Sequence, residues 1–170
     1  GQTKQFPCPS AAAIDPCQCY YEDTSVFLDC TSVTSEEQLA EVFQQDFPVK
    51  DLDSFIIEST TSLVTLDFDT NGVTFKNVAF HPGPSTIETI SASFFGDSVD
   101  TLESVRIYSS NVTTEGFPFT SLSQFTQLRD VDISGSNVET IPQVESSSIQ
   151  YFGVINSKVA TLTPGTNNMR

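Results

Sequence analysis

The clearest feature of the sequence is a short alternation of apolar and polar positions that occurs five times. Each copy has one apolar residue before and one after a central residue. This is the period-two pattern of a strand with one buried face. A further apolar residue stands three positions before each copy. The copies are Phe55–Ile57, Val78–Phe80, Val105–Ile107, Val131–Ile133 and Phe152–Val154. The pattern predicts five short strands.

A second pattern follows each predicted strand. It consists of a hydroxyl residue, an aliphatic residue two positions later, and a threonine–aliphatic pair after one more residue. Its copies begin at residues 61, 85, 110, 136 and 157, and the copy at 110 has Glu115 in place of the last aliphatic residue. Joined, the two patterns give L-x-x-L-x-L-x-x-(S/T)-x-L-x-x-L, which is the leucine-rich-repeat frame.

This frame predicts an α/β repeat solenoid of leucine-rich repeats. Its curved parallel sheet would line the concave side, and short convex segments would join the strands. One repeat cannot bury its own apolar side chains, so stacked neighbours would form a continuous core. The phenylalanines between the strands would pack in that core. A β-sandwich with alternating strands is the alternative.

The N-terminal third has no copy of the frame. We expect residues 1–48 to form a disulfide-rich N-terminal cap with one helix at about 35–46, and residues 49–170 to form about five leucine-rich repeats with an incomplete C-terminal end. Thr34 with Glu37, or Ser35 with Gln38, has the spacing of a capping box at the start of a helix. Pro48 would end this element.

The cysteines are confined to this N-terminal part, at Cys8, Cys17, Cys19 and Cys30. Zinc sites favour Cys-x-x-Cys pairs, which are absent from the sequence, so two disulfides are the better interpretation. Disulfides predict an oxidising compartment and a secreted chain. Four cysteines allow three connectivities, and their spacing does not choose among them. Asn111 begins the sequon Asn-Val-Thr. In a secreted chain this is a candidate glycosylation site, and the alternative is a sequon that carries no glycan.

Charge narrows the possible partners. The 22 acidic and 7 basic residues give a net charge of −15, which would repel nucleic acid and anionic lipid. No apolar run approaches the roughly 20 residues that a membrane helix needs, so we expect no membrane insertion. The 14 phenylalanines and a hydrophobic content of 38% indicate a folded chain.

Catalytic chemistry has little support in the sequence. The sequence has a single histidine and neither a nucleophile motif nor a phosphate loop. We therefore expect that the chain is not an enzyme and has no cofactor or metal. Asp67, Asp69 and Asn71 resemble the start of a calcium loop, but Val78 stands where such a loop needs a bidentate acid. The Asn71-Gly72 pair is also a turn signal.

The strand positions that face away from the predicted core are the candidates for binding. Three of the seven basic residues, together with tyrosines, would share this concave face. Tyrosine and arginine are frequent hot-spot residues of protein interfaces. A solvated face with local ion pairs, such as Arg106 with Asp132 or Asp130, is the alternative. The candidate binding residues are Lys76, His81, Arg106, Tyr108, Arg129, Asp132 and Tyr151.

The segments Cys8-Pro9, Pro16–Cys19 and Leu28–Cys30 resemble the cysteine-rich cap of extracellular leucine-rich-repeat proteins. The segment from Ser35 to Pro48 is similar to crustacean secreted proteins of the oplophorus-luciferin 2-monooxygenase non-catalytic subunit kind. This resemblance implies the pairing Cys8–Cys19 and Cys17–Cys30. It also implies a binding or accessory role without light-emitting chemistry.

These observations predict a secreted, non-catalytic leucine-rich-repeat module that holds an unidentified protein partner on its concave face. The alternative is a structural or assembly protein that self-associates through the uncapped repeat end. Beyond Leu162 the sequence has neither a second cysteine cluster nor a polar helix to cover that end.

Overall fold

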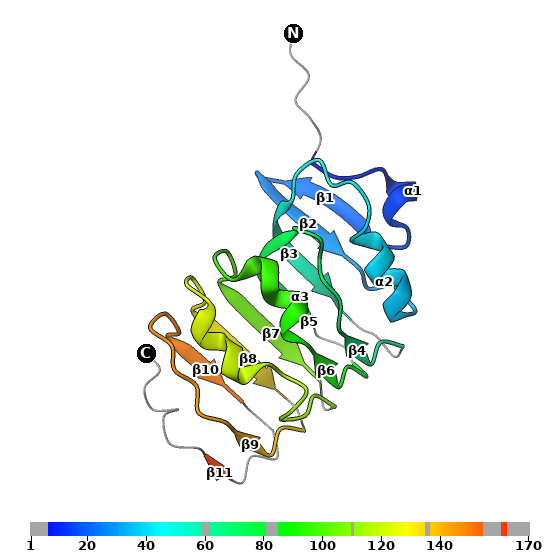
Figure 1. The fold of residues 1–170 in the computed structure, drawn as a ribbon. Coiled ribbons are helices and arrows are strands. Elements are labelled where there is room, and N and C mark those ends of the chain that lie inside the picture. Colours follow the sequence, from blue (N-terminus) through cyan, green and yellow to red (C-terminus); the bar gives the residue numbers. More distant parts are fainter. Residues whose placement is uncertain are drawn as a thin grey trace.

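The computed structural model describes residues 7–58, 62–80, 85–109, 111–134 and 137–154, together with the backbone of 161–162. Its centre is a sheet of seven strands in the order β1-β2-β3-β5-β7-β8-β10. Figure 1 shows these strands side by side in the order of the chain. Their bounds are Gln18–Glu22 (β1), Ser25–Asp29 (β2), Asp51–Ile57 (β3), Thr74–Phe80 (β5), Ser104–Tyr108 (β7), Asp130–Ser134 (β8) and Tyr151–Gly153 (β10).

The predicted fold class is wrong. The structure is not a leucine-rich-repeat solenoid with a curved parallel sheet but a single mixed sheet of seven strands with few helices. β1 pairs with β2 antiparallel, and the other neighbours pair parallel. The hairpin arises because Asp23 and Thr24 both have positive φ, at 49° and 69°, as a two-residue hairpin turn requires. The repeat frame starts after this hairpin and carries no information about it.

The five predicted strands themselves are confirmed, since each overlaps an observed strand of the sheet. Two pairs of two-residue strands lie apart from the large sheet, β4 (Thr65–Leu66) with β6 (Thr89–Ile90) and β9 (Thr140–Ile141) with β11 (Thr161–Leu162). Figure 1 shows both pairs along one side of the molecule.

The helices are short. They are α1 (Ala11–Ile14), α2 (Glu36–Val42), α3 (Ala92–Phe95) and the 3₁₀ helices η1 (Gly96–Ser98) and η2 (Phe119–Gln124). α2 lies within the segment 35–46 that was expected to be helical. Ser35 caps it by accepting a hydrogen bond from the Gln38 amide, and Glu36 and Glu37 occupy the first turn, where acids suit the helix dipole.

The core lies between one face of the sheet and the helices. Phe94 of α3 packs against Phe55 of β3, with ring centroids 5.5 Å apart, and Phe43 at the end of α2 lies 5.9 Å from Phe55. Further along the sheet, Phe119 of η2 lies 6.0 Å from Phe152 of β10. The prediction that the phenylalanines between the strands are core residues is therefore confirmed.

Two disulfides hold the N-terminal part. They pair Cys8 with Cys19 and Cys17 with Cys30, which is the pairing that the resemblance implied. Cys30 follows β2, and its amide donates to the Ile56 carbonyl of β3 at 2.9 Å. The second disulfide therefore attaches the segment before the hairpin to the edge of the parallel strands.

The opposite side of the sheet, which we call the open face, carries the alternate residues of each strand. Their side chains are exposed or half-buried, in contrast to the buried residues between them. In the part of the chain that the structure describes, the phenylalanines of the helices pack on the other side. In the described part of the chain, the open face therefore presents these side chains to solvent.

Candidate functional site

Side chains of the open face form rows across the sheet, because the strands pair in register. One row contains Phe27, Ser54, Asn77, Ser104, Asp130 and Tyr151. The adjacent row contains Asp29, Ile56, Ala79, Arg106, Asp132 and Gly153. The register thus brings Arg106 and Asp132 into adjacent positions and places Tyr151 near the end of the face.

Two of the predicted cations, Lys76 and Arg129, have acidic partners at the start of the strands. Arg129 Nη2 lies 2.7 Å from Glu103 Oε1, and Lys76 Nζ lies 3.7 Å from Asp53 Oδ1. Both cation side chains are more than half exposed, so each ion pair contributes little stability. Their charges are nevertheless locally balanced.

Arg106 differs from these two residues. It is exposed in the middle of β7, between Ala79 of β5 and Asp132 of β8. The carboxylate of Asp132 instead accepts a hydrogen bond from the Ser134 hydroxyl. Within the described part of the chain, the guanidinium group of Arg106 makes no hydrogen bond or ion pair. The ion pair with Asp132 or Asp130 that the sequence offered as an alternative is therefore not formed.

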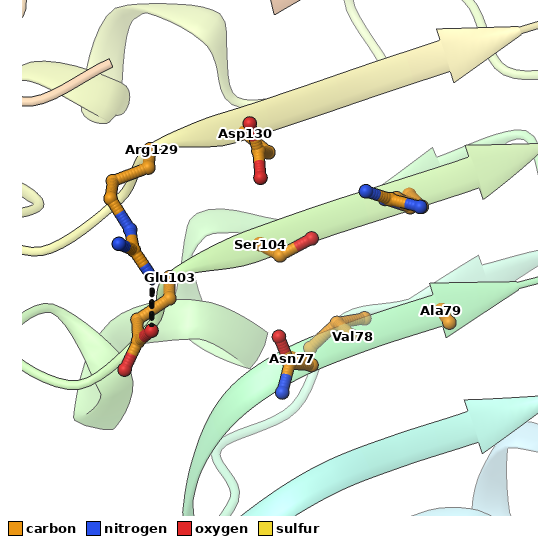
Figure 2. A pocket seen from close by; sticks show the side chains of 8 residues that line it. Asn77, Val78, Ala79, Glu103, Ser104, Arg129 and Asp130 are labelled. Atoms are coloured by element: carbon orange, nitrogen blue, oxygen red, sulfur yellow. Dashed lines mark hydrogen bonds and ion pairs between the residues drawn. The ribbon is translucent and has the colours of Figure 1, made fainter. Parts of the chain in front are cut away.

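A pocket of about 280 Å³ opens beside Arg106. The pocket forms because the side chains of Ala79 and Ser104 are small and lie between longer side chains of the open face. Figure 2 shows Asn77, Ser104 and Asp130 on three successive strands, with the Arg129–Glu103 ion pair at one end. The lining residues are Asn77, Val78, Ala79, Glu103, Ser104, Arg106, Arg129 and Asp130. The pocket therefore offers two guanidinium groups, two carboxylates, an amide and a hydroxyl within one hollow.

The remaining predicted residues lie around this centre. Tyr151 is 45% exposed and shares a row with Asp130, whereas Tyr108 is half-buried and pairs in register with Ser134. His81 lies outside the described residues. The structure thus brings Arg106 and Arg129 to one pocket, and places Lys76, Tyr108, Asp132 and Tyr151 outside its lining.

Sequence reasoning missed the contribution of the hairpin to the open face. Tyr20 of β1 faces Phe27 of β2 in register, and their rings stack with centroids 5.1 Å apart. β1 was not expected as a strand. Its sequence, Gln-Cys-Tyr-Tyr-Glu, lacks the apolar–polar alternation that would have identified it.

Asn111 lies in the turn after β7. Its amide donates to Ser109 Oγ at 3.3 Å, and its side-chain nitrogen lies 3.5 Å from the Ser85 carbonyl. Asn111 and Thr113 are half-buried, whereas Val112 between them is buried. The two functional residues of the sequon are therefore partly accessible to solvent.

The segment that resembled a calcium loop forms a tight turn. Asn71 and Gly72 have φ of 55° and 84°, and the Asn71 amide donates to Asp69 Oδ1 at 2.6 Å. Among the described residues, no three histidine, cysteine, aspartate or glutamate side chains gather as metal ligands would. The described helices are too short to cross a membrane.

The structure is that of a small mixed-sheet protein with two disulfides. Its open face holds a polar pocket beside Arg106. Over 144 residues, or 84% of the chain, it is 31% identical to the oplophorus-luciferin 2-monooxygenase non-catalytic subunit of Oplophorus gracilirostris. The chain spans 39% of the length of that relative. No family model matches the chain, and no solved structure matches it significantly.

Proposed function

We propose that the chain is a secreted, non-catalytic module that holds a protein partner on the open face of its sheet. The observation that carries this proposal is Arg106, an exposed guanidinium group beside a pocket and without a partner among the described residues. Arginine presents a planar fork of donors that matches a carboxylate. The group best suited to Arg106 is therefore an aspartate or glutamate side chain of the partner.

The surroundings of Arg106 support this assignment. Asn77 and Ser104 add neutral polar groups to the same pocket, and their neighbour Ala79 leaves room for an incoming side chain. The ion pairs of Arg129 with Glu103 and of Lys76 with Asp53 leave these two cations less available to a partner. Selectivity for an acidic group would then depend mainly on Arg106.

The comparison with a known protein supports a non-catalytic role. The relative from Oplophorus gracilirostris is named as a non-catalytic subunit, a polypeptide that belongs to an assembly. The two disulfides suit a secreted chain, because such bonds persist in oxidising compartments. By analogy, the partner would be another secreted polypeptide.

Self-association is the second candidate. Among the described strands, β10 pairs with β8 alone, and no described strand occupies its other edge. An open edge can pair with another strand. β10 has only three residues, Tyr151–Gly153, and offers few hydrogen bonds. We therefore favour the open face over this edge.

Capture by immobilised protein tests the proposal. Wild type, Arg106→Glu and Lys50→Glu would each be incubated with secreted fluid from the source tissue, and retained proteins identified by mass spectrometry. Lys50 is the matched control because, among the described residues, its Nζ hydrogen-bonds to the Asn71 carbonyl alone, at 3.2 Å, and it does not line the pocket. We expect one polypeptide to be retained by wild type and Lys50→Glu but lost with Arg106→Glu. Equal retention by all three proteins would contradict the proposal.

Light scattering after size exclusion separates the two candidates. A monomer of 18.5 kDa at high concentration would exclude self-association. A dimer that persists in Arg106→Glu would favour pairing at the β10 edge.

A further inference from the structure

The hairpin carries an aromatic surface at the end of the open face opposite Tyr151. The rings of Tyr20 and Phe27 stack at an interplanar angle of 16°, and Tyr20 is 39% exposed. Ile56 of β3 lies in the adjacent row, beside Asp29, and is half-buried. We call Tyr20, Phe27 and Ile56 the hairpin patch. Exposed apolar side chains that gather in this way mark interaction sites more often than isolated ones do.

Three carboxylates surround the hairpin patch. Glu22 lies in β1 and pairs in register with Ser25, Asp29 lies beside Ile56, and Glu58 follows the end of β3. Among the described residues, none of the three forms an ion pair. Asp29 accepts hydrogen bonds from Thr31, and Glu22 and Glu58 are exposed.

The electrostatic field of these acids reaches the patch. Burial raises the pKa of the Tyr20 phenol above its ordinary value of 10.0, and the charges of Asp29, Glu22 and Glu58 raise it further. All three carboxylates therefore act on one aromatic ring, and the described residues place no compensating cation there. An aromatic ring surrounded by acids is complementary to a cation, which the ring attracts through its quadrupole and the acids through their charge.

We propose that the hairpin patch binds an arginine or lysine side chain of a protein partner. The flexible stems of these side chains can cover Phe27 and Ile56 while their charged ends meet the carboxylates. Anionic lipid and nucleic acid do not fit, because the same carboxylates repel phosphate. The proposal extends the function proposed above to a second contact on the same face, and it uses none of the residues of the Arg106 pocket.

Acetylated, amidated tetraarginine is a suitable probe, and its binding can be measured by isothermal titration calorimetry, which does not depend on the tyrosines that the variants remove. Tyr20→Leu removes the π-system of the ring, and the double variant Glu22→Gln/Glu58→Gln removes two charges. Tyr20→Leu should weaken binding about threefold, which corresponds to the loss of one exposed cation–π contact, and the double variant should also weaken it because two attracting charges are lost. Tyr21→Leu and Glu41→Gln/Glu139→Gln are the matched controls, since these residues lie outside the patch, and they should have little effect.

Equal losses in the patch variants and the matched controls would show general attraction to an acidic chain and would overturn the proposal. Arg106→Gln should leave tetraarginine binding unchanged. A failure at the hairpin patch is thus separable from a failure at the Arg106 pocket.

A second measurement uses the wild-type protein. Arginine stays charged well above pH 10, so bound tetraarginine should oppose the field of the acids and lower the pKa of Tyr20. Phenolate absorbance during an alkaline titration reports this change, and Tyr20→Phe identifies the contribution of Tyr20 to the signal. A Tyr20 titration that saturating tetraarginine does not shift would refute the proposal.

Discussion

The ring of Tyr151 lies across Gly153, two residues further along the same strand. A Cβ atom at position 153 would stand 2.5 Å from Tyr151 Oη and 2.8 Å from its Cζ. Gly153 is buried although it belongs to a row of the open face, because the tyrosine ring covers it. The absence of a side chain at 153 therefore decides where Tyr151 lies.

Gly153→Ala should displace Tyr151 from the sheet without unfolding the protein. The atoms in the way are the far end of a flexible side chain, so we expect a stability loss below about 1 kcal/mol. NMR of the Tyr151 ring would detect the displacement, and urea denaturation would give the free energy of unfolding. Gly96→Ala is the control, since a Cβ atom there meets nothing within 4 Å. An unchanged Tyr151 spectrum in Gly153→Ala would contradict the prediction.

Gly116→Ala should be far more damaging. A Cβ atom at position 116 would collide with the backbone carbonyl oxygen of Glu88, which cannot rotate away as a side chain can. The Gly116 carbonyl also accepts from the Ile90 amide at 2.7 Å, so a displaced backbone would strain this bond. We expect a loss of about 3 kcal/mol, measured by urea denaturation beside Gly96→Ala. Equal midpoints for the two variants would refute this account.

Removal of the Cys17–Cys30 disulfide should destabilise the protein more than removal of Cys8–Cys19. Cys17 and Cys30 are both buried, whereas Cys19 is only half-buried, so the first change also removes core packing. Loss of a native disulfide costs about 2–5 kcal/mol, and we expect Cys17→Ala/Cys30→Ala at the upper end. Thermal and urea unfolding of the two double variants provide the comparison. A larger loss for Cys8→Ala/Cys19→Ala would show that packing is not the deciding difference.

Asn111 should carry an N-linked glycan when the chain passes through a eukaryotic secretory pathway. Asn111 and Thr113 are both half-buried and so partly accessible, whereas Val112 between them is buried. Mass spectrometry before and after treatment with an N-glycosidase would reveal the glycan. Asn111→Gln and Thr113→Ala should abolish the mass difference, and Asn77→Gln, which lies in no sequon, should preserve it. A wild-type protein without a mass difference would exclude the site.

The strands could be predicted because their apolar–polar alternation has a direct structural cause. The buried positions of β7, Val105 and Ile107, alternate with exposed Arg106, and this alternation correctly placed Arg106 on the open face. The fold class could not be predicted in the same way. The repeated frame starts at β3 and carries no information about the antiparallel hairpin, whose turn residues Asp23 and Thr24 are not a usual hairpin pair.

The sequence also could not show which charged residues of the open face form ion pairs with each other. Arg106 and Arg129 are both among the positions predicted to face away from the core, yet of the two only Arg129 meets an acid, Glu103, among the described residues. Which neighbouring carboxylate a long side chain reaches depends on local geometry, here on the Ser134 hydroxyl that engages Asp132. The pocket likewise depends on the small side chains of Ala79 and Ser104 lying in adjacent strands, which becomes visible only once the register is known.

Asp53 connects the antiparallel hairpin to the parallel strands of the sheet. Its Oδ2 accepts from the Val26 amide of the hairpin at 2.7 Å, and its Oδ1 pairs with Lys76 of β5. The Cys30 amide adds a bond to β3 close by. Hydrogen exchange within a folded protein occurs through cooperative openings of contiguous units. Because Asp53 belongs to β3 and holds both neighbours, the amides of β2 should exchange with those of the central strands as one unit, rather than as a hairpin that opens by itself.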